Sequence, residues 1–90
     1  MNRDVQHCQG AFFVEYEGRR IAELTYAMQG DDAVAEHTWV DPKFRGGTLA
    51  RDLVEALAAW ARTEGRKVVP ACAYVQGVFA RDERYGDLRG

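Results

Sequence analysis

The chain has 90 residues, of which 47% are hydrophobic and 29% charged, and its formal net charge is -2. This length fits one domain spanning residues 1–90, and the composition is that of a folded globular chain. No apolar run approaches the ~20 residues that cross a bilayer, and the polar start at residues 1–4 does not fit a signal peptide. We therefore expect a cytoplasmic protein with no membrane partner. The slightly acidic balance also argues against a dedicated nucleic-acid binder.

Few residues of the chain suit a metal site. His7 and Cys8 are far from His37 in the sequence, and these residues lack the paired spacing that a tetrahedral zinc site needs. We expect no bound metal. Two cysteines in a chain of cytosolic character more often stay free thiols than form a disulfide. His7 and Cys8 are expected to belong to an ordered or frayed N-terminal segment.

The first half of the chain has the period of strands. Apolar and polar residues alternate over residues 11–16, 21–28 and 34–40, with turn residues between these segments. They predict an antiparallel three-strand meander. In the third strand, one face is expected to carry Val34, Thr38 and Val40, and the other face Ala35, His37 and Trp39.

The second half changes to a helical period. Apolar residues recur at Leu49, Leu53, Leu57 and Trp60, and Gly65 is a helix-ending signal. Residues 68–75 predict a fourth strand, parallel to the third through a right-handed β-α-β crossover. Pro70 has no N–H to donate, which indicates incomplete pairing of that strand. Residues 76–85 predict a short C-terminal helix, and the expected fold class is α/β (α+β).

The segment Arg45-Gly46-Gly47-Thr48-Leu49-Ala50 lies between a predicted strand end and a predicted helix start. Unpaired N–H groups and the helix dipole make such a terminus an anion site, and glycines let a ligand approach the backbone. Arg45 could add a charged hydrogen bond to a phosphate, with Lys43 contributing more loosely. A glycine pair alone is more often an ordinary loop, so that alternative stays open.

Four segments carry a resemblance to a known family: residues 36–40, residues 42–50, the helix through Gly65, and residues 67–75. With these segments, the chain resembles the short GNAT acetyltransferase-like proteins described as YjdJ-like. The family's loop pattern Q/R-x-x-G-x-G/A falls on residues 45–50, where Thr48 departs from the central glycine. The resemblance implies a minimal GNAT-like fold, a splayed parallel strand pair that admits pantetheine, and acetyl-CoA (coenzyme A) as cofactor. The implied cofactor-binding residues are Val40, Arg45, Gly46, Gly47, Thr48, Leu49 and Ala50.

The resemblance also places a cysteine near the expected thioester, and this makes Cys72 the first candidate nucleophile. The alternative is a small buried thiol. His37 is the candidate general base for an amine, although a lone strand histidine more often only packs or hydrogen-bonds, and Glu36 is its rival. Tyr74 and Tyr85 are weaker candidates for protonating a departing thiolate, because tyrosines are more often packing residues.

The sequence thus predicts an acetyl-CoA-binding domain that transfers an acetyl group to an unidentified amine. The alternative is a non-catalytic acyl-CoA-binding or protein-interaction module with the same fold. Full-length GNAT enzymes build the acceptor pocket from segments that these 90 residues do not supply. A homodimer could complete that missing wall.

Overall fold

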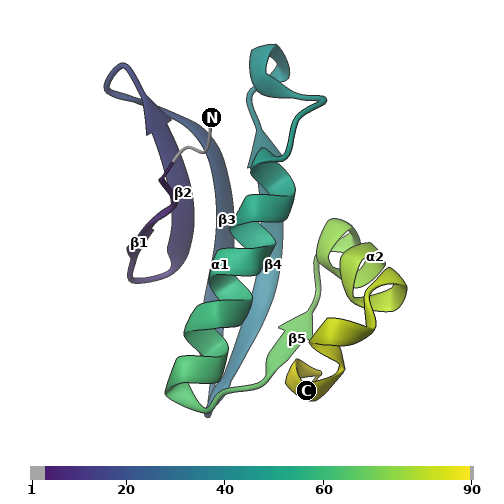
Figure 1. Ribbon diagram of the computed structural model, residues 1–90. Helices are drawn as coiled ribbons and strands as arrows, with labels where there is room; N and C mark the ends of the chain where they lie inside the picture. Colours follow the sequence, from purple (N-terminus) through teal and green to yellow (C-terminus); the bar gives the residue numbers. More distant parts are fainter. Residues whose placement is uncertain (1–3, 90) are drawn as a thin grey trace.

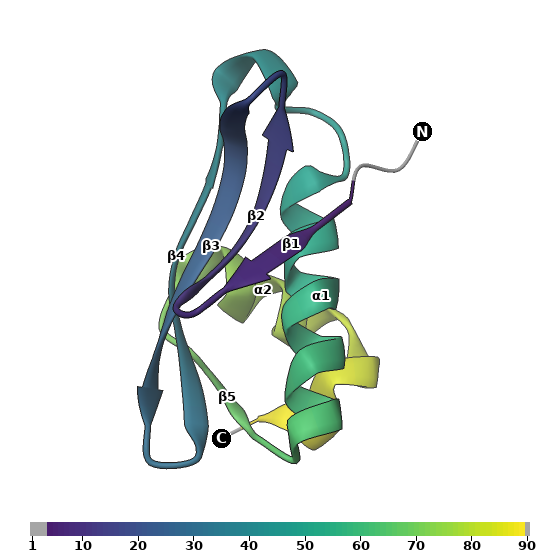
Figure 2. The ribbon, with the colours of Figure 1, turned by 90° about the vertical axis from the view of Figure 1, so that its left-hand side faces the viewer.

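The computed structural model describes residues 4–89 and has two layers, a twisted five-stranded sheet and a long helix against one of its faces (Figures 1 and 2). The strands lie in the order β1-β2-β3-β4-β5. In chain order the elements are β1 (Gln6–Cys8), β2 (Ala11–Tyr16), β3 (Arg19–Gln29), β4 (Asp32–Val40), the 3-10 helix η1 (Pro42–Phe44), α1 (Leu49–Glu64), β5 (Val68–Pro70), α2 (Ala73–Arg81) and the 3-10 helix η2 (Glu83–Leu88). This mixed α/β arrangement confirms the predicted fold class.

The antiparallel meander contains one strand more than the sequence predicted. β2, β3 and β4 pair as expected, and β1 adds to the free edge of β2 through pairs such as His7 with Phe12. The His7 ring stacks on the Phe12 ring with 4.1 Å between centroids, and its Nε2 lies 2.5 Å from the Tyr26 hydroxyl. The segment of His7 and Cys8 is therefore a strand. Three exposed residues carry too little apolar alternation to predict one.

A bulge in β4 corrects the predicted faces of this strand. The pairing with β3 passes from Ala35 opposite Tyr26 to His37 opposite Thr25, which leaves Glu36 unpaired. An extra residue reverses the alternation that follows it. Directly opposite residues share a face of the sheet, so Ala35 and Thr38 both face α1, and the prediction that they lie on opposite faces was wrong.

The crossover from β4 through α1 to β5 is parallel, as predicted, but β5 is much shorter than expected. Its register ends at Ala35 opposite Pro70, after which the N–H groups of Ala71 and Cys72 both donate to the Ala35 carbonyl, at 3.0 and 2.9 Å. The predicted strand over residues 68–75 was therefore wrong beyond Pro70. The chain turns there into α2, so the helix predicted over residues 76–85 begins earlier and stops at Arg81.

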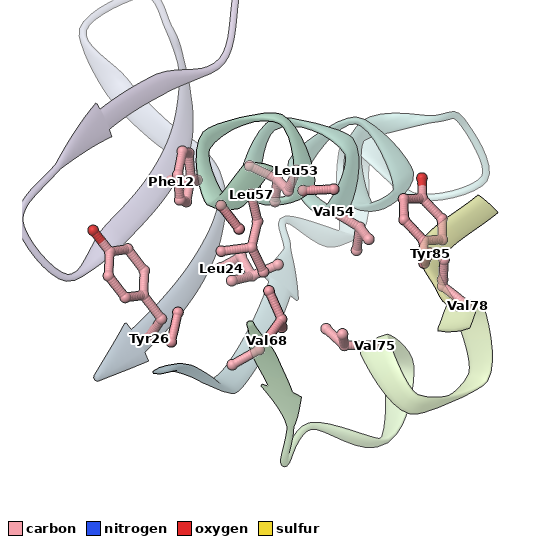
Figure 3. Packing of buried hydrophobic residues seen from close by; sticks show 14 of the residues in the cluster. Phe12, Leu24, Tyr26, Leu53, Val54, Leu57, Val68, Val75, Val78 and Tyr85 are labelled. Atoms are coloured by element: carbon pink, nitrogen blue, oxygen red, sulfur yellow. The ribbon is translucent and has the colours of Figure 1, made fainter. Parts of the chain in front are cut away.

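Most of the core lies between α1 and the sheet. The buried side of α1 is the predicted apolar stripe, and the helix ends at Gly65 with a left-handed φ of 67°, as expected. Figure 3 shows Leu24, Leu57 and Val68 pointing toward one another from β3, α1 and β5. All three side chains are fully buried, and each such burial stabilises the fold by roughly 1.5–3 kcal/mol. Within residues 4–89, no helix is both long and apolar enough to cross a membrane.

Candidate functional site

The divergence of β4 and β5 creates an open strand edge. β4 stays paired with β3 as far as Val40, whereas its pairing with β5 ends at Ala35. Figure 1 shows β5 and α2 turning away from β4 on this side. Within the described residues, the edge of β4 from Glu36 to Val40 therefore has no neighbouring strand. Such an edge presents backbone N–H and C=O groups to a ligand.

A groove runs along this edge and consists of two adjoining cavities. The first has a volume of about 220 Å³ and is lined by Val40, Phe44, Arg45, Gly46, Gly47, Leu49, Ala50 and Tyr74. The second has a volume of about 450 Å³ and is lined by His37, Thr38, Trp39, Val40, Arg45, Ala50 and Tyr74. Because four lining residues are shared, the groove is continuous from the loop before α1 to the middle of β4.

Six of the seven residues predicted to bind the cofactor line this groove, and Thr48 is the exception. Thr48 occupies the N-cap position of α1, but its hydroxyl donates to the Asp52 carboxylate at 3.1 Å instead of capping a backbone N–H. The N–H groups in the first turn of a helix lack partners within the helix. They are thus available at the groove, with the Asp52 carboxylate nearby as a competing negative charge.

The loop before α1 is held by Asp41, which sequence reasoning missed as a structural anchor. Its Oδ1 accepts from the Lys43 N–H at 2.9 Å, and its Oδ2 accepts from Arg19 Nη1 at 2.6 Å. The hydrogen bonds from Arg19 and from the Lys43 backbone lower the pKa of Asp41 below its ordinary value. An Asp-Pro pair is a turn signal, but its partner on β3 is distant in sequence.

The two glycines of the loop have different roles. Gly46 has φ of +92°, a conformation that side chains disfavour, so glycine is needed there for the backbone path. Gly47 has an ordinary φ, and a Cβ added to it would meet no atom within 4 Å. The space above Gly47 is therefore open, and a ligand can approach the start of α1 there.

Arg45 crosses the groove and contacts the strand edge. Its Nε donates to the Val40 carbonyl at 2.8 Å, which ties the loop to the end of β4. That bond uses one of five N–H donors of the guanidinium. Arg45 is exposed, so its positive charge is accessible to an anion in the groove.

Cys72 lies at the N-cap of α2, not within a strand as the sequence predicted. It is half-buried, and its Sγ lies 3.3 Å from Oγ1 of Thr38 on β4. Burial alone raises the pKa of the Cys72 thiol. Hydrogen bonds with Thr38 and with the backbone amides of Val75 and Tyr74 lower this pKa by more than burial raises it. The net pKa is below the ordinary value. The N-terminus of α2, where Cys72 lies, likewise favours the thiolate.

The other candidate groups are distributed around the groove. His37 lines it but faces away from α1, and within residues 4–89 no hydrogen bond joins it to Cys72. Glu36 is exposed at the bulge. Tyr74 lines both cavities, and burial raises its pKa. Tyr85 is only 3% exposed and stacks on Phe79 in the core, so it does not reach the groove.

Comparison with known proteins agrees with this geometry. Residues 11–88, most of the chain, match the family described as GCN5-related N-acetyl-transferase. The chain belongs to this family. The YjdJ-like subgroup stays a prediction. No curated protein matches the chain.

Solved structures of GNAT proteins share the fold. A GCN5-like candidate N-acetyltransferase from Staphylococcus aureus has a TM-score of 0.80 and 21% identity, over 99% of this chain and 89% of that one. A ribosomal-protein-alanine N-acetyltransferase from Brucella melitensis has a TM-score of 0.60 and 13% identity, over 79% and 58%. An aminoglycoside N-acetyltransferase in complex with CoA has a TM-score of 0.52 and 20% identity, over 79% and 63%. The chain thus spans nearly the whole of the first protein but under two thirds of the other two.

A separate cavity of about 300 Å³, away from the groove, is lined by Glu55, Ala58, Arg62, Arg84 and Tyr85. Both of its arginines are already paired, Arg62 with Asp87 at 3.1 Å and Arg84 with Asp82 at 2.7 Å. This cavity therefore attracts an anion less strongly than the groove does at Arg45. Among the described residues, no group of three or more His, Cys, Asp or Glu side chains could hold a metal ion.

Proposed function

We propose that this GNAT domain binds acetyl-CoA in the groove and transfers the acetyl group to an amine. The observation that carries the proposal is the continuous groove from the loop at residues 45–50 to the open edge of β4 beside Cys72. Membership of an acetyltransferase family supports the reaction class, and the CoA complex of a structural neighbour supports the ligand.

The loop end of the groove suits a pyrophosphate. The N–H groups at the start of α1 and the helix dipole attract anions, and the open space above Gly47 admits one. Arg45 adds a positive charge with several remaining donors. The pantetheine amides would then lie along the unpaired edge of β4 near Val40, where a ligand can pair as an added strand does.

Cys72 is the proposed nucleophile. Its thiol loses a proton to solvent, and the thiolate attacks the thioester carbonyl of acetyl-CoA. A new S–C bond forms on Cys72 as the carbon–sulfur bond to CoA breaks. The CoA thiolate leaves and takes up a proton. Tyr74 is the candidate donor because it lines both cavities, and burial raises the pKa of its hydroxyl, which keeps that hydroxyl protonated.

His37 is the proposed base of the second half-reaction. It lies on the rim of the groove, and its imidazole can take a proton from an amine that attacks acetyl-Cys72. The N–C bond forms, the S–C bond breaks, and the Cys72 thiolate is regenerated. His37 would act on the acceptor, since it makes no hydrogen bond to Cys72 within the described residues.

A second candidate function is acyl-CoA binding, or contact with a protein partner, without turnover. The observation that favours it is that this chain covers only 58% and 63% of the length of two GNAT neighbours whose activity is stated. A homodimer in which the partner subunit forms a wall of the acceptor site would be compatible with catalysis. Its cytoplasmic location likewise stays a prediction.

The experiment that separates these functions is acetyl labelling. The protein is incubated with acetyl-CoA carrying a labelled acetyl group, and the modified cysteine is located by peptide mass spectrometry. Transfer predicts label on Cys72 that is lost in Cys72→Ser and kept in Cys8→Ser, because Cys8 is exposed on β1 and outside the groove. Binding of acetyl-CoA without label on either cysteine would favour the module.

A further inference from the structure

The environment of Cys72 depends on a residue from another element. Thr38 lies in β4 and Cys72 at the start of α2, and their side chains meet across the point where β4 and β5 separate. The distance from Sγ to Oγ1 is 3.3 Å, within the range of a hydrogen bond that involves sulfur. Both side chains are half-buried, so water competes less for either group than it would on an open surface.

Thr38 reaches Cys72 because of the bulge at Glu36. The extra residue places Thr38 on the face toward α1, opposite Leu24, and not on the face that uninterrupted alternation would give it. The chain then turns into α2 beside β4, and the hydrogen bonds of the Ala71 and Cys72 N–H groups to the Ala35 carbonyl hold this turn. The contact is thus built by two local irregularities that each depart from regular strand pairing.

We propose that Thr38 is a positioning residue for Cys72. The Thr38 hydroxyl accepts from the thiol and donates to the thiolate, and it thereby holds the sulfur beside Thr38, a residue that lines the groove. This role rests on the proposed function of Cys72 as acetyl acceptor. A threonine hydroxyl can both donate and accept, so the contact persists when the sulfur loses its proton. The β-branched side chain has few rotamers, which fixes the direction of its hydroxyl oxygen.

Thr38 is the group near the Cys72 sulfur whose hydrogen bond can be removed by a substitution without a change of charge. The amides of Tyr74, Val75 and Thr38 also favour the thiolate, but they belong to the backbone and stay in every variant. The titratable or charged groups that line the groove are Tyr74 on α2, His37 on β4 and Arg45 in the loop before α1. Thr38 itself does not titrate, so replacing it changes the hydrogen bond and adds or removes no charge.

The test measures the thiol directly and needs no acetyl-CoA. In a Cys8→Ser background only Cys72 can react, so the rate of its alkylation by iodoacetamide is recorded against pH for the parent, Thr38→Val and Thr38→Ser. Thr38→Val keeps the shape without the hydroxyl, and Thr38→Ser keeps the hydroxyl. We expect the midpoint of the profile to move to higher pH in Thr38→Val and to return toward the parent value in Thr38→Ser.

At a pH below the midpoint, alkylation of Thr38→Val should be roughly threefold slower. Losing one hydrogen bond to a charged group lowers the thiolate fraction about tenfold, while the remaining thiolate becomes intrinsically more nucleophilic as its pKa rises. Circular dichroism and a melting curve establish that each variant is folded. If Thr38→Val does not fold, Thr38→Ala against Thr38→Ser gives the same comparison, since both lack the methyl group and differ by the hydroxyl.

Superimposable profiles for variants with and without the hydroxyl would overturn the proposal. This outcome is distinct from failure of the proposed function. A domain that binds no acetyl-CoA would still show the Thr38-dependent profile, and a domain that is labelled at Cys72 could still lack it.

Discussion

Arg45 donates a hydrogen bond from Nε to the carbonyl oxygen of Val40 at 2.8 Å, so the loop before α1 and the open strand edge are joined by one side chain. The sequence predicted Arg45 as a phosphate ligand only. In the structure it also sets the position of the loop relative to β4, and it lines both cavities of the groove. A residue with both roles should not tolerate a change that keeps only its charge.

Arg45→Lys therefore tests this double role. A lysine ammonium is a compact charge that cannot span the strand and a phosphate as a planar guanidinium does. We expect acetyl-CoA to bind roughly tenfold more weakly, measured by calorimetry. Arg20→Lys is the control, because Arg20 lies 4.0 Å above the Phe13 ring on the sheet face away from α1. Equal affinities of Arg45→Lys and the parent would contradict a role in binding.

Replacing each of the two candidate tyrosines should have a different effect on the rate at which Cys72 is labelled. Tyr74→Phe removes the hydroxyl that lines the groove, and we expect roughly a 10²-fold slower labelling of Cys72, the lower range for loss of a general acid, with unchanged binding. Tyr85→Phe alters a core residue and should lower the melting temperature without slowing labelling of the folded protein. The assignment is wrong if both variants label at the parent rate.

The Asp82 carboxylate should make stability dependent on pH. It bonds Arg84 and also Arg51 of α1, and these hydrogen bonds and charges lower the pKa of Asp82 to about 2. Because this folded-state pKa lies below the ordinary value of 3.8, the stabilisation is complete above about pH 4 and is lost as pH falls toward 2. Asp82→Asn should thus melt at a lower temperature than the parent at neutral pH.

The difference in melting temperature between Asp82→Asn and the parent should shrink as the pH approaches 2, since the parent carboxylate is then protonated as well. Asp31→Asn is the matched control. The Asp31 side chain is 100% exposed and lies 4.0 Å from Arg66, so its replacement should leave the melting temperature unchanged. A constant difference across the whole pH range would show that the Asp82 effect is not electrostatic.

The packing of α1 on the sheet should dominate the free energy of unfolding. Leu57 is fully buried, and Leu57→Ala is expected to cost about 2–5 kcal/mol by denaturant titration, through lost burial and the cavity left behind. Met28 is 44% exposed at the far end of β3, so Met28→Ala should change the free energy of unfolding by less than about 0.5 kcal/mol. Similar losses for both variants would contradict this location of the core.

The regular elements were predictable because their signals are local and long. The apolar stripe from Leu49 to Ala61 and the left-handed Gly65 specify α1, and alternation specifies β2 and β3. The irregular positions were not. The bulge at Glu36 depends on pairing with β3, and the end of β5 depends on the Ala35 carbonyl accepting two N–H groups.

The same distinction holds for the groove. The glycine loop was evident from composition and order alone, and five of its six residues line the groove, together with the predicted Val40 of β4. The immediate partner of Cys72 was not predictable, because Thr38 is distant in sequence and reaches the sulfur only through the bulge and the turn into α2. One local signal was present: Val75, Val78 and Phe79 are apolar and have helical spacing, which could have indicated that the helix begins before residue 76.

Calorimetric titration of Gly47→Glu against Gly47→Gln tests most directly the claim that the groove binds the phosphates of acetyl-CoA at the start of α1. Gly47 has an ordinary φ and open space around it, so both variants should fold, and they differ only in charge. We expect saturable one-site binding to the parent, weaker binding to Gly47→Gln, and loss of binding in Gly47→Glu. Equal affinity of the two variants, or no heat from the parent at millimolar acetyl-CoA, would contradict the claim.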